Sequence, residues 1–264
     1  MQATKPVPEP ETPPLHLDET IPVAPADDAM PAPAMVSLTV RGISRDARLT
    51  LPAGDHITLA VEHSGTYYEH ELLHAISTLP HGGTFVDAGA HYGNHSVFFG
   101  LECGADRIVS IEPNPTTYAG LVRNLEDNGL ADRATTVHAA IHESWRRVDI
   151  DIPAWDPGPD SPAISNTGMS RVEAATGDGA VDAMPLDEIL EDAEDVALIK
   201  IDVEGNALGV VRSAQGTIER FKPVLILEAL SDEEQAQLVA FFVPLGYRAY
   251  GPYNWTPTWI WAAA

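Results

Sequence analysis

Cysteine and basic residues are scarce in this sequence of 264 residues. The single cysteine, Cys103, excludes an internal disulfide and any cysteine-based zinc or iron–sulfur site assembled within the chain. The 15 lysines and arginines face 39 aspartates and glutamates, which gives a formal net charge of −24 at pH 7. Because this charge repels the phosphate backbone of DNA and RNA, we expect no nucleic-acid partner.

Long apolar runs are absent as well. No stretch approaches the roughly 20 apolar residues of a membrane-crossing helix, and the N-terminus has no basic segment followed by an apolar one. We therefore expect a soluble, cytoplasmic protein with no membrane partner. With 44% hydrophobic residues, the chain is long enough for one substantial core. The composition does not indicate an oligomeric state.

The composition changes along the chain and predicts three parts. Residues 1–35 are rich in proline and acidic residues and lack an apolar period, so we expect a disordered tail. Residues 36–83 are expected to form a β lead-in and a helix, and residues 84–264 the main domain. Within the main domain, residues 151–182 contain so many prolines and glycines that they predict a long loop, and a loop of this length in a compact domain is usually functional or mobile.

Two kinds of apolar pattern predict the secondary structure. Alternation at 36–40 and 57–61 predicts a small antiparallel lead-in, and apolar residues three to four apart predict a helix over 69–79. Beyond residue 84, short apolar strands alternate with amphipathic helices, which is typical of a doubly wound α/β fold with a mostly parallel sheet. The strands of this sheet are expected at 84–87, 107–111, 134–138, 196–202 and 224–228.

Ligands of such sheets bind beyond the carboxyl ends of the strands, so the residues that follow each strand are informative. The first strand is followed by a turn in which Gly89 and Gly93 let the backbone approach a ligand, while Asp87 can accept hydrogen bonds. The spacing Asp-x-Gly-x-x-x-Gly differs from the dinucleotide motif Gly-x-Gly-x-x-Gly. Glu112 ends the neighbouring strand, where a carboxylate can accept both hydroxyls of a ribose.

A third group of polar residues ends the strand at 196–202. Alternation places Lys200 and Asp202 on the same side of this strand, and Glu204 follows two residues later. A lysine in an apolar run is costly to bury without a partner, so we expect it to pair with Asp202, Glu204 or Glu228. These charged groups are the candidate acid–base residues.

Four segments together resemble the FkbM family of S-adenosylmethionine-dependent methyltransferases. They are FVDAGAHYGN at 85–94, IEPNP at 111–115, KIDVEG at 200–205 and PVLILE at 223–228. The resemblance extends from about residue 67 to residue 250. It implies a class I methyltransferase sheet of seven strands, the last ones antiparallel, with S-adenosylmethionine as cofactor.

The resemblance also implies which residues would bind the cofactor. The glycine turn would surround its methionine portion, Glu112 its ribose, and the segment 138–141 its adenine. The implied cofactor-binding residues are Asp87, Gly89, Ala90, Gly93, Asn94, Glu112, Pro113, Asn114, Ala139 and Ala140. The sequence departs from the family pattern at His91 and His95, which puts the fine shape of the pocket in question.

The family mostly methylates hydroxyl groups of sugars, polyketides and other natural products, so the expected partner is a small hydroxylated acceptor, and the loop at 151–182 is the candidate to bind it. A hydroxyl must lose its proton as it is methylated, and Asp202 and Glu204 are the first candidates to remove that proton or to orient the acceptor, with Lys200 setting their charge. A divalent metal ion held by the same carboxylates is a second, less favoured alternative. His91 and His95 have no identifiable third ligand, so we expect no metal there.

Two further alternatives remain open at this point. The chain could methylate an amine or a peptide side chain, which needs no strong base if the amine arrives neutral. It could also keep the fold and bind the nucleoside without turnover. In that case the cofactor residues would persist while Asp202 and Glu204 would be idle.

Overall fold

The computed structural model describes residues 34–79, 82–151, 171–174, 181–203, 206–254 and 257–264. The predicted tail lies outside the described residues up to residue 33, as does most of the predicted loop at 151–182. In the described part of the chain, no helix is both long enough and apolar enough to cross a membrane.

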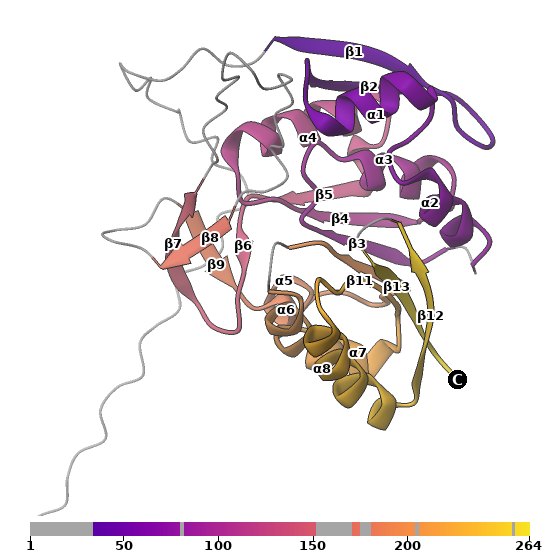
Figure 1. The fold of residues 1–264 in the computed structure, drawn as a ribbon. Coiled ribbons are helices and arrows are strands. Elements are labelled where there is room, and N and C mark those ends of the chain that lie inside the picture. The colour runs from indigo at the N-terminus through magenta and orange to yellow at the C-terminus, as the bar shows by residue number, and fades with distance from the viewer. Residues whose placement is uncertain (1–33, 80–81, 152–170, 175–180, 204–205, 255–256) are drawn as a thin grey trace, which may run out of the picture. The chain divides into compact units, whose positions relative to one another are not determined.

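Seven of the described strands form one sheet in the order β12-β13-β11-β10-β3-β4-β5 (Figure 1). Neighbours from β11 to β5 are parallel, whereas β13 is antiparallel to both β11 and β12. This confirms the predicted doubly wound α/β fold with antiparallel last strands. The strands are β3 (Thr84–Ala88), β4 (Arg107–Ile111), β5 (Ala134–Val137), β10 (Leu198–Ile201), β11 (Val224–Glu228), β12 (Tyr247–Tyr253) and β13 (Thr258–Ala263).

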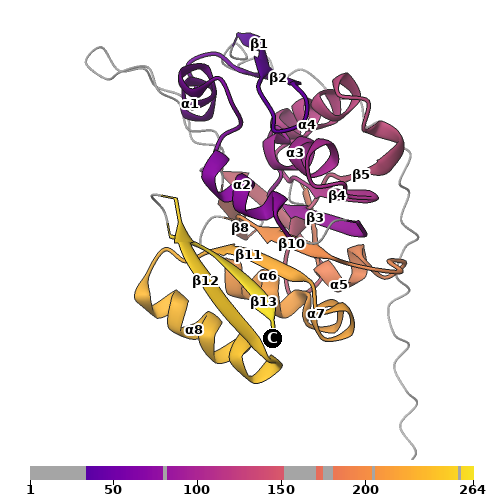
Figure 2. The same cartoon turned by 90° about the vertical axis from the view of Figure 1, so that its right-hand side faces the viewer.

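Helices cover both faces of this sheet, as Figures 1 and 2 show. Successive strand residues pack into different apolar clusters: Leu198 belongs to the cluster with α3 and α4, and Ile199 to the cluster with α6 and α8. Asn114 caps α4 by accepting a hydrogen bond from the Thr116 backbone, as its position before a proline predicts. These helices are α3 (Asn94–Leu101), α4 (Pro115–Asp127), α5 (Leu186–Ile189), α6 (Ala207–Ser213), α7 (Gln215–Phe221) and α8 (Asp232–Phe242).

The N-terminal lead-in is confirmed as an antiparallel pair, but its second strand is not where the alternation predicts it. β1 (Met35–Val40) pairs with β2 (Ala47–Pro52), and the expected strand at 57–61 is wrong because α1 (His56–Ser64) occupies this segment. Asp55 caps α1 by accepting from the Ile57 backbone, and Gly65 ends it with a positive φ. The helix α2 (His70–Ser77) falls within the predicted range.

A second, four-stranded sheet has the order β6-β9-β7-β8. It was not predicted, and it places strands at the ends of the segment 151–182, where only a loop was expected. The described parts of this segment contribute β8 and the start of β9, while 152–170 and 175–180 lie outside the described residues. The strands are β6 (Ala140–Ile141), β7 (Arg146–Asp151), β8 (Arg171–Ala174) and β9 (Val181–Met184).

Candidate functional site

The turn after β3 is pressed against the end of β10. The strand order reverses at this point: β4 and β5 follow β3 on one side, whereas β10 and β11 lie on its other side. Open α/β sheets bind ligands where the strand order reverses. Gly89 has a φ of +79°, and a Cβ added there would lie 2.0 Å from the carbonyl oxygen of Asp202. At Gly93, with a φ of +84°, a Cβ would lie 2.7 Å from Leu121. Both predicted glycines are therefore required by the local geometry.

Glu112 lies beside this turn, so the structure brings together the two strand ends on which the predicted cofactor site depends. Its Oε2 accepts a hydrogen bond of 2.8 Å from the His91 backbone N–H, and its Oε1 accepts from the backbone of Asn114 and the hydroxyl of Thr117. Burial raises the pKa of Glu112, although these three donors act in the opposite direction. The contribution of Thr117 was not predicted from the sequence.

Lys200 joins the turn to β3 and β10. Its ammonium lies 3.2 Å from Asp87 and 3.3 Å from Asp202, and it donates a 2.9 Å hydrogen bond to the carbonyl oxygen of Gly89. Burial alone would lower the pKa of Lys200, but Asp87 and Asp202 outweigh it and raise this pKa. The predicted pairing with Asp202 is found, and Asp87 is a second partner that was not predicted.

Asp87 is fully buried beneath the turn. Its other carboxylate oxygen accepts a 2.6 Å hydrogen bond from Ser96, whose hydroxyl also meets that of Ser110. The side-chain carboxylate thus has its partners within the protein, where it anchors Lys200 and the start of α3.

Asp202 is the member of this cluster that is exposed to solvent. Its side chain is 48% exposed, against 6% for Lys200. Partial burial would raise the pKa of Asp202, but the Lys200 ammonium outweighs it, with smaller contributions from His95 and His91, and lowers this pKa. Asp202 therefore carries its negative charge at neutral pH. Glu204, the other candidate acid, lies outside the described residues.

The remaining predicted cofactor residues occupy different places around the same strand ends. Asn94 uses its amide to hold the backbone of Tyr68, at 3.0 and 3.2 Å. Pro113 offers its carbonyl oxygen to the ring of His138, at 3.0 Å. Small, buried side chains are found at three other predicted positions, namely Ala90, Ala139 and Ala140.

His91 stands in the turn with a φ of +52°, a conformation that histidine adopts more readily than most residues with a side chain. Its ring packs edge-on against Tyr92. Burial lowers the pKa of His91 to about 4; nearby Asp55 acts in the opposite direction and Lys200 in the same one. The ring is therefore neutral at pH 7. In the sequence, only the departure from the family pattern at this position draws attention to His91.

No group of three or more histidine, cysteine, aspartate or glutamate side chains among the described residues is arranged to hold a metal ion. Because Glu204 is not described, the divalent-metal alternative stays a prediction.

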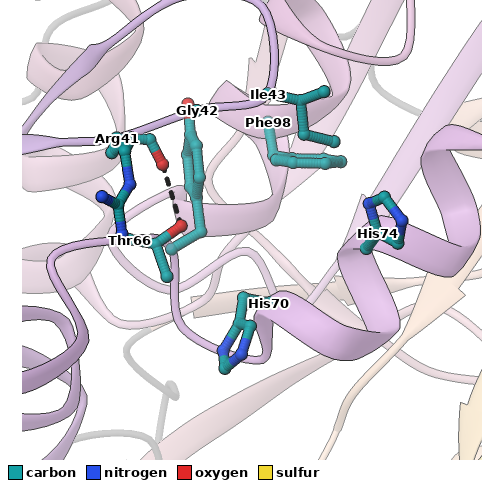
Figure 3. A pocket seen from close by; sticks show the side chains of 8 residues that line it. Arg41, Gly42, Ile43, Thr66, His70, His74 and Phe98 are labelled. Atoms are coloured by element: carbon teal, nitrogen blue, oxygen red, sulfur yellow. Dashed lines mark hydrogen bonds between the residues drawn. The ribbon is translucent and has the colours of Figure 1, made fainter.

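A separate cavity of about 260 Å³ lies where the end of β1 meets α2 and α3 (Figure 3). Its lining includes Arg41, Phe98 and the exposed His70 and His74, and the Arg41 carbonyl accepts a hydrogen bond from Thr66. None of the predicted site residues lines it, so this cavity is distinct from the strand-end site.

The order of the sheet and the glycine turn beside an acidic strand end define a class I methyltransferase fold. The family model of the methyltransferase FkbM domain matches residues 87–249, and the chain therefore belongs to the FkbM family of S-adenosylmethionine-dependent methyltransferases. A comparison with curated proteins gives no match.

The chain is also similar to solved methyltransferase structures. Methyltransferase FkbM from Methylobacillus flagellatus KT is 22% identical, with a TM-score of 0.49, over 72% of this chain and 50% of that one. This chain therefore spans half the length of that relative. An rRNA methylase from Streptococcus thermophilus is 14% identical over 74% and 96% of the two chains, with a TM-score of 0.46. TrmK from M. capricolum, in complex with S-adenosyl-homocysteine, is 10% identical over 72% and 66%, with a TM-score of 0.45.

The strand-end residues fit the cofactor of this family. Glu112 is an ionisable acceptor at the end of β4, and its Oε2 has one backbone donor in the described structure, which leaves acceptor capacity for hydroxyl groups. The first backbone N–H groups of α3 follow the glycine turn and have no acceptor within their helix, so they suit a carboxylate.

We expect cofactor affinity to fall on acidification because Glu112 becomes protonated. The ionised carboxylate of Glu112 accepts hydrogen bonds from hydroxyl groups, and its protonation reduces this acceptor capacity. Because burial raises the pKa of Glu112, the affinity is lost at a higher pH than an ordinary glutamate would allow. Calorimetric titration with S-adenosylhomocysteine between pH 8 and pH 5 measures this dependence. In Glu112→Gln the affinity should be weaker and nearly independent of pH, and a curve parallel to that of the unaltered protein would contradict the assignment.

Proposed function

We propose that this chain transfers the methyl group of S-adenosylmethionine to a hydroxyl group of a sugar or secondary metabolite. The observation that carries the proposal is the placement of Asp202, an ionised and half-exposed carboxylate beside the glycine turn. It borders a small hollow that Glu69 and Glu228 also line. Ionised carboxylates only accept hydrogen bonds, so this lining suits an acceptor rich in hydroxyl donors.

Different residues of the chain act on the cofactor and on the methyl acceptor. Glu112 would hold hydroxyl groups of the cofactor, and backbone N–H groups at the start of α3 would bind its carboxylate. When bound, the cofactor supplies an electrophilic methyl group on a sulfonium. Asp202 orients the acceptor hydroxyl toward that methyl group, and holding the reacting atoms in line supplies much of the rate. Because the pKa of Asp202 is lowered, this carboxylate is better suited to orienting the hydroxyl than to removing its proton.

A screen of acceptors tests the proposal. The full chain is incubated with S-adenosylmethionine and two panels, one of hydroxylated sugars and natural products and one of matched amines, and the products are examined by mass spectrometry. We expect a mass gain of one methylene in the hydroxyl panel. Methylation confined to the amine panel would replace the proposal by nitrogen methylation, and cofactor binding without any product would favour the idle alternative.

Replacing Asp202 by asparagine should separate binding from turnover. The amide keeps the size of the side chain but removes the charge that accepts and orients the hydroxyl, so we expect methyl transfer to fall by about tenfold or more. S-adenosylhomocysteine affinity should stay within about twofold. Asp127→Asn is a matched control, because Asp127 is also partly exposed, at 34%, and pairs with Arg123 at the C-terminal end of α4. Equal turnover in the two variants would remove Asp202 from the site.

A further inference from the structure

A histidine–carboxylate pair lies beside the strand-end site. Nε2 of His95 is 3.0 Å from Oε2 of Glu69, and both side chains are largely buried, with 7% and 17% exposed. His95 stands in the first turn of α3, directly after the glycine turn, and Glu69 immediately precedes α2. The sequence places these residues 26 positions apart, and no motif connects them.

The carboxylate of Glu69 is held from two sides. Its Oε1 accepts a 2.7 Å hydrogen bond from Asn254, in the turn between β12 and β13, while its Oε2 faces His95. Glu69 and Asn254 both have positive φ values, of 57° and 63°. Such a conformation is unfavourable for a residue with a side chain, and residues held in it gather at functional sites. The local backbone thus directs Glu69 toward His95 instead of capping α2, where its side chain makes no capping hydrogen bond.

The pair also lies close to the charged end of β10. Glu69 lines the same hollow as Lys200, Asp202 and Glu228. His95 is near enough to Asp202 for its charge to contribute to the lowered pKa of that carboxylate. The charged groups that face the imidazole are therefore Glu69, at the start of α2, and Asp202, at the end of β10.

We propose that His95 is the proton acceptor of the methyl transfer and that Glu69 positions its ring. The carboxylate of Glu69, 3.0 Å from Nε2, favours the tautomer that carries the proton on Nε2, so that the lone pair of Nδ1 is left to receive the proton of the acceptor hydroxyl. As the oxygen–carbon bond forms, this proton passes to Nδ1, and the electron pair of the broken carbon–sulfur bond stays on sulfur. This inference rests on the proposed function, since only a hydroxyl acceptor requires such a base.

The neighbouring groups are less suited to this role. The pKa of Asp202 is lowered by Lys200, and the pKa of His91 is lowered to about 4, so both are weak bases at neutral pH. Imidazole is the side chain most often used as a general base, and a carboxylate on one nitrogen that leaves the other nitrogen free is the arrangement found in catalytic triads.

The experiment is nitrogen NMR of the histidine rings in the full chain, free and bound to S-adenosylmethionine or S-adenosylhomocysteine. In the free protein we expect His95 in one tautomer, with the proton on Nε2. The two ligands differ by one positive charge, located at the reacting methyl group. If His95 faces that group, the ¹⁵N chemical shifts of its ring should differ between the two complexes, because the charge of S-adenosylmethionine then lies close to the imidazole. The exposed His74, on α2, is the internal control and should not respond.

Two variants complete the test. Glu69→Gln should abolish the tautomer preference of His95, and His95→Gln should lower methyl transfer about a hundredfold to the acceptor found in the screen, with S-adenosylhomocysteine affinity unchanged. Equal ring shifts of His95 in the two complexes would overturn the proposal, even if hydroxyl acceptors are methylated. Absence of a hydroxyl acceptor would instead overturn the proposed function, whatever the ring shifts of His95 are. If His95→Gln does not fold, the ring shifts of the unaltered protein still decide.

Discussion

Replacing Lys200 by methionine is expected to cost about 3–5 kcal/mol of folding free energy. The Lys200 side chain is 6% exposed, and its ammonium lies between Asp87, which is fully buried, and the half-exposed Asp202. Methionine retains the apolar stem but leaves the carboxylate of Asp87 buried without its cation. It also removes the hydrogen bond to the Gly89 carbonyl. Urea unfolding followed by circular dichroism measures the loss.

Two controls show whether the buried charge is the cause. Asp87→Asn combined with Lys200→Met removes both charges, so the double variant should be more stable than Lys200→Met alone. Arg123→Met breaks an exposed pair with Asp127 on α4, and its effect should stay below about 0.5 kcal/mol. A double variant no more stable than the single one would show that the packing of the lysine stem, and not its charge, dominates.

Gly89→Ala is expected to weaken cofactor binding and to destabilise the fold. The new Cβ would lie 2.0 Å from the Asp202 carbonyl oxygen, on rigid backbone, and the residue would keep a φ of +79°. The left-handed conformation alone costs about 1–2 kcal/mol, and relief of the clash requires the glycine turn to move away from β10. We expect S-adenosylhomocysteine affinity to fall by at least about tenfold in calorimetric titration, which corresponds to about 1.4 kcal/mol.

Gly129→Ala is the matched control for the backbone effect. Gly129 has a φ of +69°, yet a Cβ there meets no atom within 4 Å. This variant should therefore show the cost of the left-handed conformation alone, with cofactor affinity unchanged. If Gly89→Ala were no worse than Gly129→Ala in stability and in affinity, the close approach of the turn to β10 would have no energetic role.

The parallel strands of the main sheet could be predicted because each is marked by a local pattern in the sequence, whereas the two antiparallel strands are expected only from the family resemblance. Buried parallel strands are short apolar runs, and the residues after them lie at one edge of the sheet whatever the strand order is. This placed Gly89, Glu112 and Asp202 correctly at one edge. The pairing of Lys200 with Asp87 could not be predicted, because it depends on β10 lying directly beside β3, with these two residues opposite one another.

Other features depend on contacts that a single sequence does not display. The alternation at 57–61 favours a strand, but the Asp55 cap and the Gly65 end stabilise a helix there. The pairing of β6 with β9 involves two residues on each strand, and such short strands leave no apolar period. The contact between Glu69 and His95 requires α2 to begin over the end of the sheet, beside the β12–β13 turn, an arrangement set by tertiary packing (Figure 2).

The pairing of β7 with β8 fixes where the chain leaves and re-enters the second sheet. Asp151 lies directly opposite Arg171, so the residues that bracket the intervening segment are neighbours in space. Closing a segment between two points already held together costs little more when the segment grows, because the entropy of closure rises only with the logarithm of its length. Replacements of different length between Asp151 and Arg171 are therefore compatible with the same pairing of β7 with β8.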